Sequence, residues 1–274
     1  MPGATGTLPL DINDHGVIVG RYGSAGRTHG FLRDAAGVYT TIDFPGANFT
    51  VAAGLNDSGV VVGWYTFPAA PTVRHGFVLK EGLFTSFDPP GSTFTNALGI
   101  NARGGISGRF CTLALCRVPG SGDFHGFFLH DGAFTTIDVP GAHETNAFKV
   151  NARGAIVGGF GDVSGGERLF VLRSDAFTTF ALPNGKPITQ DNGGMNARGD
   201  ILGTYCDVAL PCVIGVTGTH GFLLSDGELT TIDFPGALAT AAAAVNARGD
   251  IVGGYVNASG QSRGFLLSSH PAAF

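Results

Sequence analysis

The stretch VNARGDIVGGY, residues 245–255, decides the fold because the chain carries five further versions of it. They begin at Ile12, Leu55, Ile100, Val150 and Met195 and read INDHGVIVGRY, LNDSGVVVGWY, INARGGISGRF, VNARGAIVGGF and MNARGDILGTY. The second residue of every version is asparagine, and we call these residues the marker asparagines: Asn13, Asn56, Asn101, Asn151, Asn196 and Asn246. Subtraction gives spacings of 43, 45, 50, 45 and 50 residues. A period of about 40–50 residues is typical of a propeller blade built from four strands.

Four short segments make up each repeat unit. A first segment of small residues and threonine leads into the marker asparagine, and the glycine-bounded segment follows across NARGD or NDSGV, which favours a tight hairpin. The third segment is HGFLL or a variant, at His29, His75, His125, Arg168, His220 and Arg263. The fourth, FTTIDFPGA or a relative, occurs only five times, at Tyr39, Phe84, Phe134, Phe177 and Leu229.

These segments predict an all-β chain that forms one six-bladed β-propeller of four-stranded blades over residues 1–274, with the last blade short of its outer strand. The repeat units run over about residues 2–46, 47–91, 92–141, 142–184, 185–236 and 237–274. We expect almost no helix, because no segment keeps a 3.6-residue apolar period.

Composition limits the classes of function. Hydrophobic residues make up 43% of the 274 residues and charged residues 14%, which is typical of a globular domain with a substantial core. The net charge of −5 and the lack of a Lys/Arg run argue against a nucleic-acid partner. No apolar run approaches the length of a membrane-spanning helix, so we expect no membrane insertion. We expect a monomer.

The combined pattern GxFTTIDFPGAxxTxAxGINARGDIVGGYxDxxGxxHGFLL resembles the HAF-repeat family, a group of bacterial and often extracellular repeat proteins. The resemblance covers essentially the whole chain, although the fourth copy (GERLFVL, FTTFALPNG) departs from the pattern. It implies a propeller-like β fold and export, and no established activity.

Residues that are alike in every unit serve the scaffold, so function is expected where the units differ. For the repeated histidines we favour structural hydrogen bonds over a metal ring, and we interpret Asp43, Asp138 and Asp233 of TTID as strand-end acceptors. Two long loops each carry a cysteine pair, Cys111 with Cys116 and Cys206 with Cys212. These pairs predict two loop-closing disulfides in preference to a zinc site, and therefore an extracellular or periplasmic location.

The differences also lie five residues before the marker asparagines, where three successive units carry Asn96, Asn146 and Asp191. Oxygen ligands of this kind suit calcium, so one hypothesis places a calcium ion on these three residues in the central channel. At the level of the fold, this is similar to lactonases and phosphotriesterases of the paraoxonase and gluconolactonase kind. The alternative interpretation is that the same side chains bind water and edge carbonyls.

Other residues complete the predicted site. His143 and Glu144 could activate water as catalytic residues, although a single loop histidine is more often a surface residue. Arg117, Arg109, Lys149, Asn192 and Trp64 are the predicted ligand-binding residues; Trp64 also fits the aromatic end of a regular second strand.

Two functions follow from these residues. The first is an exported propeller that binds a small molecule, a carbohydrate or another cell-surface ligand at the loop face of its channel. The alternative is a metal-dependent hydrolase of a lactone, ester or phosphotriester. No Gly-x-Ser-x-Gly motif is present to indicate a serine hydrolase.

Overall fold

The structure is a computed structural model that describes residues 1, 3–113, 116, 124–161, 167–182, 186, 188–207 and 218–269, without the side chains of residues 189–192. Within these residues the chain forms strands and turns and contains no helix. The prediction of an all-β fold is confirmed. None of the described residues lies in a helix long and apolar enough to cross a bilayer.

The strands follow one another in antiparallel groups, which we call meanders 1 to 6. Meander 1 consists of β1 (Gly6–Ile12), β2 (Ile18–Ser24), β3 (Arg27–Arg33) and β4 (Tyr39–Ile42). Meander 2 consists of β5 (Phe49–Leu55), β6 (Val61–Phe67), β7 (Ala70–Lys80) and β8 (Leu83–Phe87). Meander 3 consists of β9 (Phe94–Ile100), β10 (Ile106–Cys111), β11 (His125–His130) and β12 (Ala133–Ile137).

The second half of the chain continues in the same order. Meander 4 consists of β13 (Glu144–Val150), β14 (Ile156–Gly161), β15 (Glu167–Arg173) and β16 (Ala176–Phe180). Meander 5 consists of β17 (Ile188–Met195), β18 (Ile201–Cys206), β19 (Thr219–Ser225) and β20 (Glu228–Ile232). Meander 6 consists of β21 (Ala239–Val245), β22 (Ile251–Val256) and β23 (Ser262–Leu267), and no described residue pairs with the outer edge of β23.

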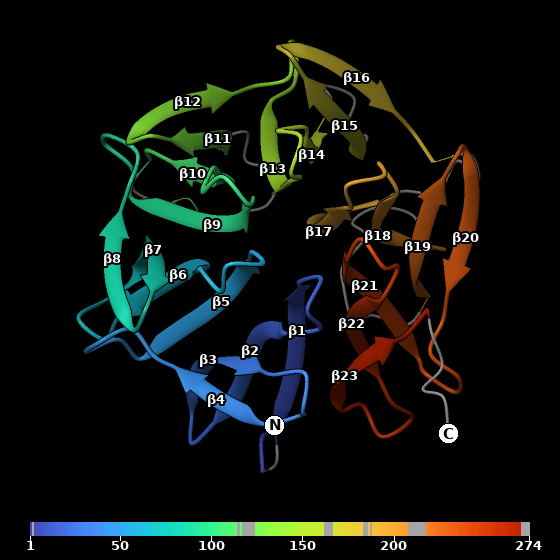
Figure 1. Cartoon of the computed structure of the whole chain (residues 1–274), viewed down its shortest axis with the longest axis horizontal. Helices are drawn as coiled ribbons and strands as arrows, with labels where there is room; N and C mark the ends of the chain where they lie inside the picture. The colour runs from blue at the N-terminus through green and yellow to red at the C-terminus, as the bar shows by residue number, and fades with distance from the viewer. Residues whose placement is uncertain are drawn as a thin grey trace.

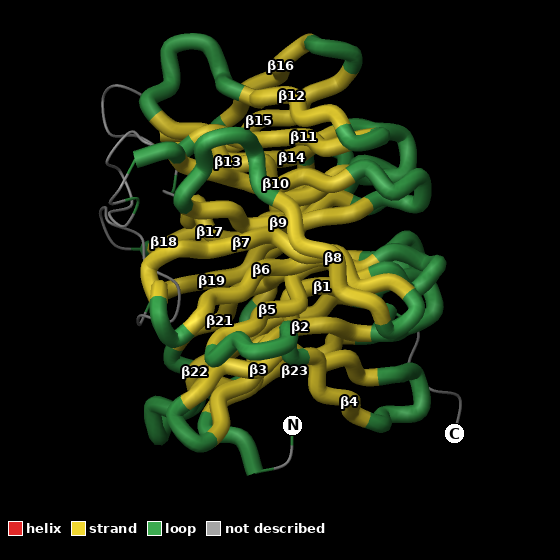
Figure 2. Tube along the Cα trace, turned by 90° about the vertical axis from the view of Figure 1, so that its left-hand side faces the viewer, coloured by secondary structure: helices red, strands yellow, loops and turns green. Residues whose placement is uncertain are grey.

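The meanders are arranged around a common centre, with the first strand of each one innermost (Figure 1). Turns and loops gather at the two ends of the strands (Figure 2). Single parallel pairs, Thr28 with Phe49 and Arg74 with Phe94, join the third strands of meanders 1 and 2 to the first strand of the next meander. Strand β1 contacts all three strands of meander 6, so the first and last meanders are neighbours.

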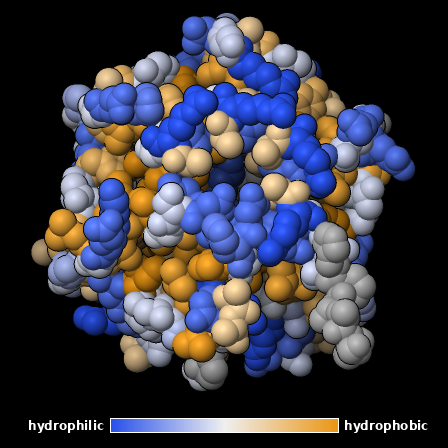
Figure 3. All heavy atoms as spheres, viewed as in Figure 1, coloured by the Kyte–Doolittle hydropathy of each residue, from blue (hydrophilic) through white to orange (hydrophobic). Residues whose placement is uncertain are grey.

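The marker asparagines explain why the hairpin sequence is repeated. The side-chain oxygen of Asn101 accepts hydrogen bonds from the backbone N–H groups of Arg103 and Gly105, which fixes the turn after β9. The carboxamide nitrogen donates to the backbone carbonyl of the next marker in the pairs Asn13–Asn56, Asn56–Asn101, Asn151–Asn196, Asn196–Asn246 and Asn246–Asn13. These bonds link successive meanders and include the link from meander 6 to meander 1. Hydrophilic surface surrounds the centre of the face shown in Figure 3.

A glycine on each second strand makes room for an aromatic core. A Cβ at Gly63 would lie 1.8 Å from the carbonyl oxygen of Val51 and 2.9 Å from the ring of Phe77. That phenylalanine belongs to the repeated HGF sequence and is fully buried, as are its equivalents Phe31, Phe127, Phe170 and Phe222. The glycine and the phenylalanine therefore fill one space together.

The repeated histidines are structural, as predicted. The Nδ1 atom of each lies 2.6–2.9 Å from the carboxylate of the residue just after the fourth strand, in the pairs His29–Asp43, His75–Asp88, His125–Asp138 and His220–Asp233. In meander 4 both partners are replaced, by Arg168 and Ala181. Because the histidine and its aspartate partner are replaced together, the hydrogen bond between them is best explained as part of the scaffold.

Candidate functional site

Several of the predicted site residues lie together between meanders 2, 3 and 4. Arg74 on β7 donates from Nη1 to the side-chain oxygen of Asn96 at 3.5 Å, and Arg109 on β10 donates from Nη1 to that of Asn146 at 3.2 Å. Both asparagines are 1% exposed, whereas the arginines are half-buried, so these contacts are partly buried. We call this group the arginine–asparagine cluster.

Aromatic rings complete the cluster. The Arg74 guanidinium lies 4.4 Å from the ring centre of Phe94 and 5.9 Å from that of Trp64. The Arg109 guanidinium lies 5.1 Å from the ring centre of Phe124. Stacking on aromatic faces stabilises these positive charges, so the cluster is a packed interface between meanders.

The cluster does not fit a calcium ion. Each carboxamide oxygen of Asn96 and Asn146 accepts from a guanidinium, and two positive charges at that position repel a cation. In the described part of the chain, no group of three His, Cys, Asp or Glu side chains is placed to hold a metal ion. The third predicted ligand, Asp191, lies in β17 with its side chain outside the described residues.

Lys149 lies apart from the arginine–asparagine cluster and takes part in an ion pair near the axis. Its Nζ atom lies 2.9 Å from Asp11 Oδ2 and donates at 2.8 Å to the carbonyl oxygens of Ala53 and Leu98. Asp11 also accepts from the backbone N–H groups of Ile12 and Leu55. The lysine thus joins the inner strands of meanders 1 to 4.

Two of the remaining predicted residues, His143 and Glu144, lie at the start of β13. His143 precedes β13, and its Nδ1 atom is buried with no hydrogen-bond partner among the described residues; Glu144 begins β13 and is 3% exposed. Arg117 lies outside the described residues, as does the side chain of Asn192. The Cys111–Cys116 disulfide is present, whereas the predicted Cys206–Cys212 pair includes Cys212, which lies outside the described residues.

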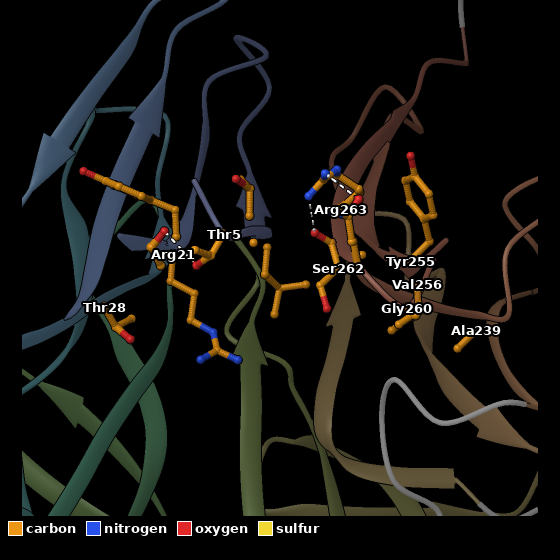
Figure 4. Close-up of a pocket in the computed structure, with 17 residues that line it drawn as sticks. Thr5, Arg21, Thr28, Ala239, Tyr255, Val256, Gly260, Ser262 and Arg263 are labelled. Atoms are coloured by element: carbon orange, nitrogen blue, oxygen red, sulfur yellow. Dashed lines mark hydrogen bonds between the residues drawn. The ribbon is translucent and has the colours of Figure 1, made fainter. Parts of the chain in front are cut away.

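A large pocket lies elsewhere, between meanders 1 and 6, and we call it the seam pocket (Figure 4). Its volume is about 520 Å³. Meander 1 and the residue before it contribute Thr5, Gly6, Thr7, Leu8, Arg21, Tyr22, Gly23 and Thr28. Meander 6 contributes Ala239, Ala241, Gly254, Tyr255, Val256, Gly260, Gln261, Ser262 and Arg263.

Three small residues open this pocket. Between meanders 2 and 3 the equivalent space is filled by Trp64, Arg74 and Phe94, with the Arg74 guanidinium over both rings. The residues at the same repeat positions around the seam are Gly254, Ser262 and Gly6. Loss of an indole, a guanidinium and a phenyl ring leaves a space that no other described side chain fills.

The polar groups of the seam pocket are neutral or positive. Hydroxyl and amide groups come from Thr5, Thr7, Thr28, Gln261 and Ser262, and guanidinium groups come from Arg21 and Arg263 on opposite walls (Figure 4). None of the described lining residues is Asp or Glu. Tyr255 is held against Phe234, with ring centres 3.7 Å apart. A ligand would therefore meet fixed walls and several hydrogen-bond donors.

The seam pocket could have been predicted from small residues in the sequence, which differences in polar residues do not indicate. The search for new polar residues leads to the long loops, whereas this pocket arises from residues that become small. Aligned by the marker asparagines, Gly6 stands where two other units carry Phe49 and Phe94, and Gly254 stands where one other unit carries Trp64. A search for unusually small residues at interface positions would have found it.

Comparison with known proteins supports the fold and leaves the family open. No protein-family model matches the chain, and no curated protein sequence matches it. The HAF-repeat assignment therefore stays a prediction.

Solved structures similar to the chain are β-propellers. The β-propeller domain of the Trilobed protease from Pyrococcus furiosus, which has an open Velcro topology, aligns with 9% identity and a TM-score of 0.56 over 96% of each chain. The Aleuria aurantia lectin in complex with Fucα1-6GlcNAc aligns with 11% identity and a TM-score of 0.57 over 97% of this chain and 98% of that one. Virginiamycin B lyase from Staphylococcus aureus aligns with 13% identity and a TM-score of 0.51 over 97% and 86%. The chain therefore has a β-propeller fold, and at these identities the likeness extends to the fold alone.

Proposed function

We propose that the chain is an exported, six-bladed β-propeller that binds a carbohydrate in the seam pocket. The blade count is supported by six meanders that match the six sequence units, and by marker asparagine bonds that return from Asn246 to Asn13. In this interpretation the last blade has three strands, and the ring is closed by side-chain and packing contacts of β1 with meander 6.

The observation that carries the binding proposal is the seam pocket itself. Its volume of about 520 Å³ lies in the ordinary range for small-molecule sites. Threonine and serine hydroxyls, a glutamine amide and guanidinium groups suit a ligand rich in hydroxyls, because such a ligand needs many hydrogen bonds. A lectin of similar fold binds a fucoside, which shows that such a fold can carry a sugar site.

A pocket-filling substitution tests this site. Gly6→Phe imports the residue that β5 and β9 carry at the same repeat position, and a Cβ at Gly6 would meet only Ser262 atoms at 3.8 Å. We expect a glycan array with the parent protein to identify sugars that the Gly6→Phe variant no longer binds. Ala133→Phe, which adds the same ring at an exposed position of β12, is the control and should bind as the parent does. Equal binding by all three proteins would show that the sugar does not bind in the seam pocket.

Export is supported by the Cys111–Cys116 disulfide, since disulfides persist in oxidising compartments. Peptide mapping of protein from its native source should find Cys111 linked to Cys116 and Cys206 linked to Cys212. Free thiols at these positions would argue for a reducing compartment.

The metal-dependent hydrolase is the second candidate. The buried, unpartnered Nδ1 atom of His143 beside Glu144 favours it, whereas the guanidinium contacts of Asn96 and Asn146 disfavour a calcium ion. Elemental analysis of the purified protein before and after chelation decides between the candidates. Calcium bound in equal molar amount, and lost with Asp191→Ala, would favour the hydrolase.

A further inference from the structure

We infer that the seam pocket selects an acidic saccharide, one that carries a carboxylate or a sulfate ester. This inference rests on the proposed carbohydrate site and adds the chemical class of its ligand. Two arginines and no acidic residue line the described walls of the pocket, in a protein whose net charge is −5. The pocket is thus a local positive region, which attracts an anionic ligand to that position.

Arg263 on β23 is held ready to bind an anion. Its Nη2 atom donates to Gln261 Oε1 at 2.9 Å and its Nη1 atom donates to the backbone carbonyl of Ser262 at 3.3 Å. Both contacts are within its own hairpin, and a guanidinium has more donors than these two bonds use. The guanidinium is therefore oriented before a ligand arrives, which lowers the entropy that binding would cost.

The hairpin that carries Arg263 is itself fixed. The side-chain oxygen of Asn257 accepts from the backbone N–H groups of Ser259 and Gln261, at 3.0 and 2.9 Å. Carboxylates and sulfates accept two parallel hydrogen bonds from a guanidinium, and such bonds are stronger than those between neutral groups.

The opposite wall supplies the second positive charge. Arg21 lies on β2, directly across the strand pair from Leu8, and extends toward the space between the two meanders (Figure 4). Arg168, which occupies the same repeat position as Arg263 on β15, does not line the seam pocket.

Paired ligands test the inference. Binding to trigalacturonic acid and to its methyl ester is measured by calorimetry, as is binding to a sulfated galactose oligosaccharide and to its desulfated form. We expect at least one acidic ligand to bind about tenfold or more tightly than its neutral counterpart, because a charged hydrogen bond contributes that much. A preference within the galacturonic acid pair indicates a carboxylate ligand, and a preference within the sulfated pair indicates a sulfate ligand.

Substitutions then assign the preference to the arginine. Arg263→Gln should reduce the difference between acidic and neutral ligands about tenfold, and Arg168→Gln, as the matched control, should leave it unchanged. Thermal unfolding of both variants shows whether the fold persists. If Arg263→Gln unfolds, Arg21→Gln provides a second test, and it should also reduce the preference for acidic ligands.

The outcomes separate the inference from the proposed function. If acidic and neutral sugars bind equally, or if Arg263→Gln and Arg21→Gln both retain the preference, the inference is wrong and the carbohydrate site stands. If no sugar of either kind binds in calorimetry or on the array, the proposed function and the inference both fail.

Discussion

At the scale of single residues, five of the six marker asparagines use one carboxamide both to fix their own turn and to bind the next meander. The oxygen of Asn56 accepts from the backbone N–H of Val60 in its own hairpin, and the nitrogen donates to the carbonyl of Asn101 in the next meander. An aspartate or serine could cap the turn, but only an amide side chain of this length both accepts and donates here. This double use accounts for asparagine at Asn13, Asn56, Asn151, Asn196 and Asn246.

Asn56→Ala should therefore destabilise the protein by about 2–3 kcal/mol, because two hydrogen bonds are lost and buried backbone groups lose their partners. Denaturant unfolding measures the change. Asn257→Ala is the control, since Asn257 fixes its hairpin in the same way but donates only to the exposed Gln261 side chain. We expect a loss below about 1 kcal/mol there. Similar losses in the two variants would contradict the importance of the link between meanders.

His220 is the residue whose charge the fold controls most clearly. Partial burial would lower its pKa, but hydrogen bonds and charges from Asp233 and Asp207 outweigh that effect and raise the pKa above the ordinary value. Its Nε2 atom lies 3.0 Å from Asp207, which is itself paired with Lys186, and its ring stacks on Tyr205.

Stability should depend on pH through this group. A raised folded pKa means that the protonated histidine stabilises the fold fully below about pH 6.5, the ordinary value, and that this contribution disappears as the pH rises through the folded pKa. We expect the Tm to fall between pH 6 and pH 9 by less in Asp207→Asn than in the parent. A parallel fall in the two proteins would show that Asp207 does not hold the proton on His220.

At the scale of strands, the sequence predicted the elements but not the register of the inner strands. The four segments of each unit correspond to strands wherever the structure describes them, because turn residues and alternating aromatics mark their limits. The inner strands, however, carry a bulge near Leu10, Ala53, Leu98, Phe148 and Ala243. These residues line the small central pocket.

The bulge explains why the site was only partly predictable. We placed Asn96 and Asn146 in the central channel from their distance to the marker asparagines, but a bulge lies between each of them and its marker, and they contact arginines of the neighbouring meander. An extra residue in a strand shifts every later side chain to the other face, and no sequence signal of the units marks its position. The polar character of the cluster could be predicted, whereas its arginine partners could not.

Gly63→Ala tests the packing of the second strand. Its new Cβ would meet backbone on one side and the buried Phe77 ring on the other, so neither neighbour can yield cheaply. We expect a loss of about 3 kcal/mol or more, or failure to fold. Gly6→Ala, whose nearest atoms would lie at 3.8 Å, should change stability by less than about 1 kcal/mol. A stable Gly63→Ala protein would show that this close packing is not required.

At the scale of the whole molecule, the axis is held by an ion pair as well as by the marker asparagines. Asp11 and Lys149 come from meanders 1 and 4, and each side chain is 12% exposed. Coulomb attraction is strong at such burial, but removal of one partner leaves a charge that water cannot reach. Neither residue follows the repeat, because the other described first strands carry glycine or alanine at this position, in Gly54, Gly99, Gly194 and Ala244.

Lys149→Met should therefore destabilise the protein by about 3–5 kcal/mol, since it leaves the Asp11 carboxylate buried without its partner. Adding Asp11→Asn should restore most of that loss, because the double variant buries no charge and the amide still accepts from Leu55 N–H. Lys80→Met, at the exposed end of β7, controls for the removal of a lysine alone. Denaturant unfolding of the parent, the double variant and both single variants, Lys149→Met and Asp11→Asn, gives the coupling free energy of the pair. If the double variant is as unstable as Lys149→Met, the loss comes from the hydrogen bonds of Lys149 to Ala53 and Leu98, and the ion pair does not hold meanders 1 and 4 together.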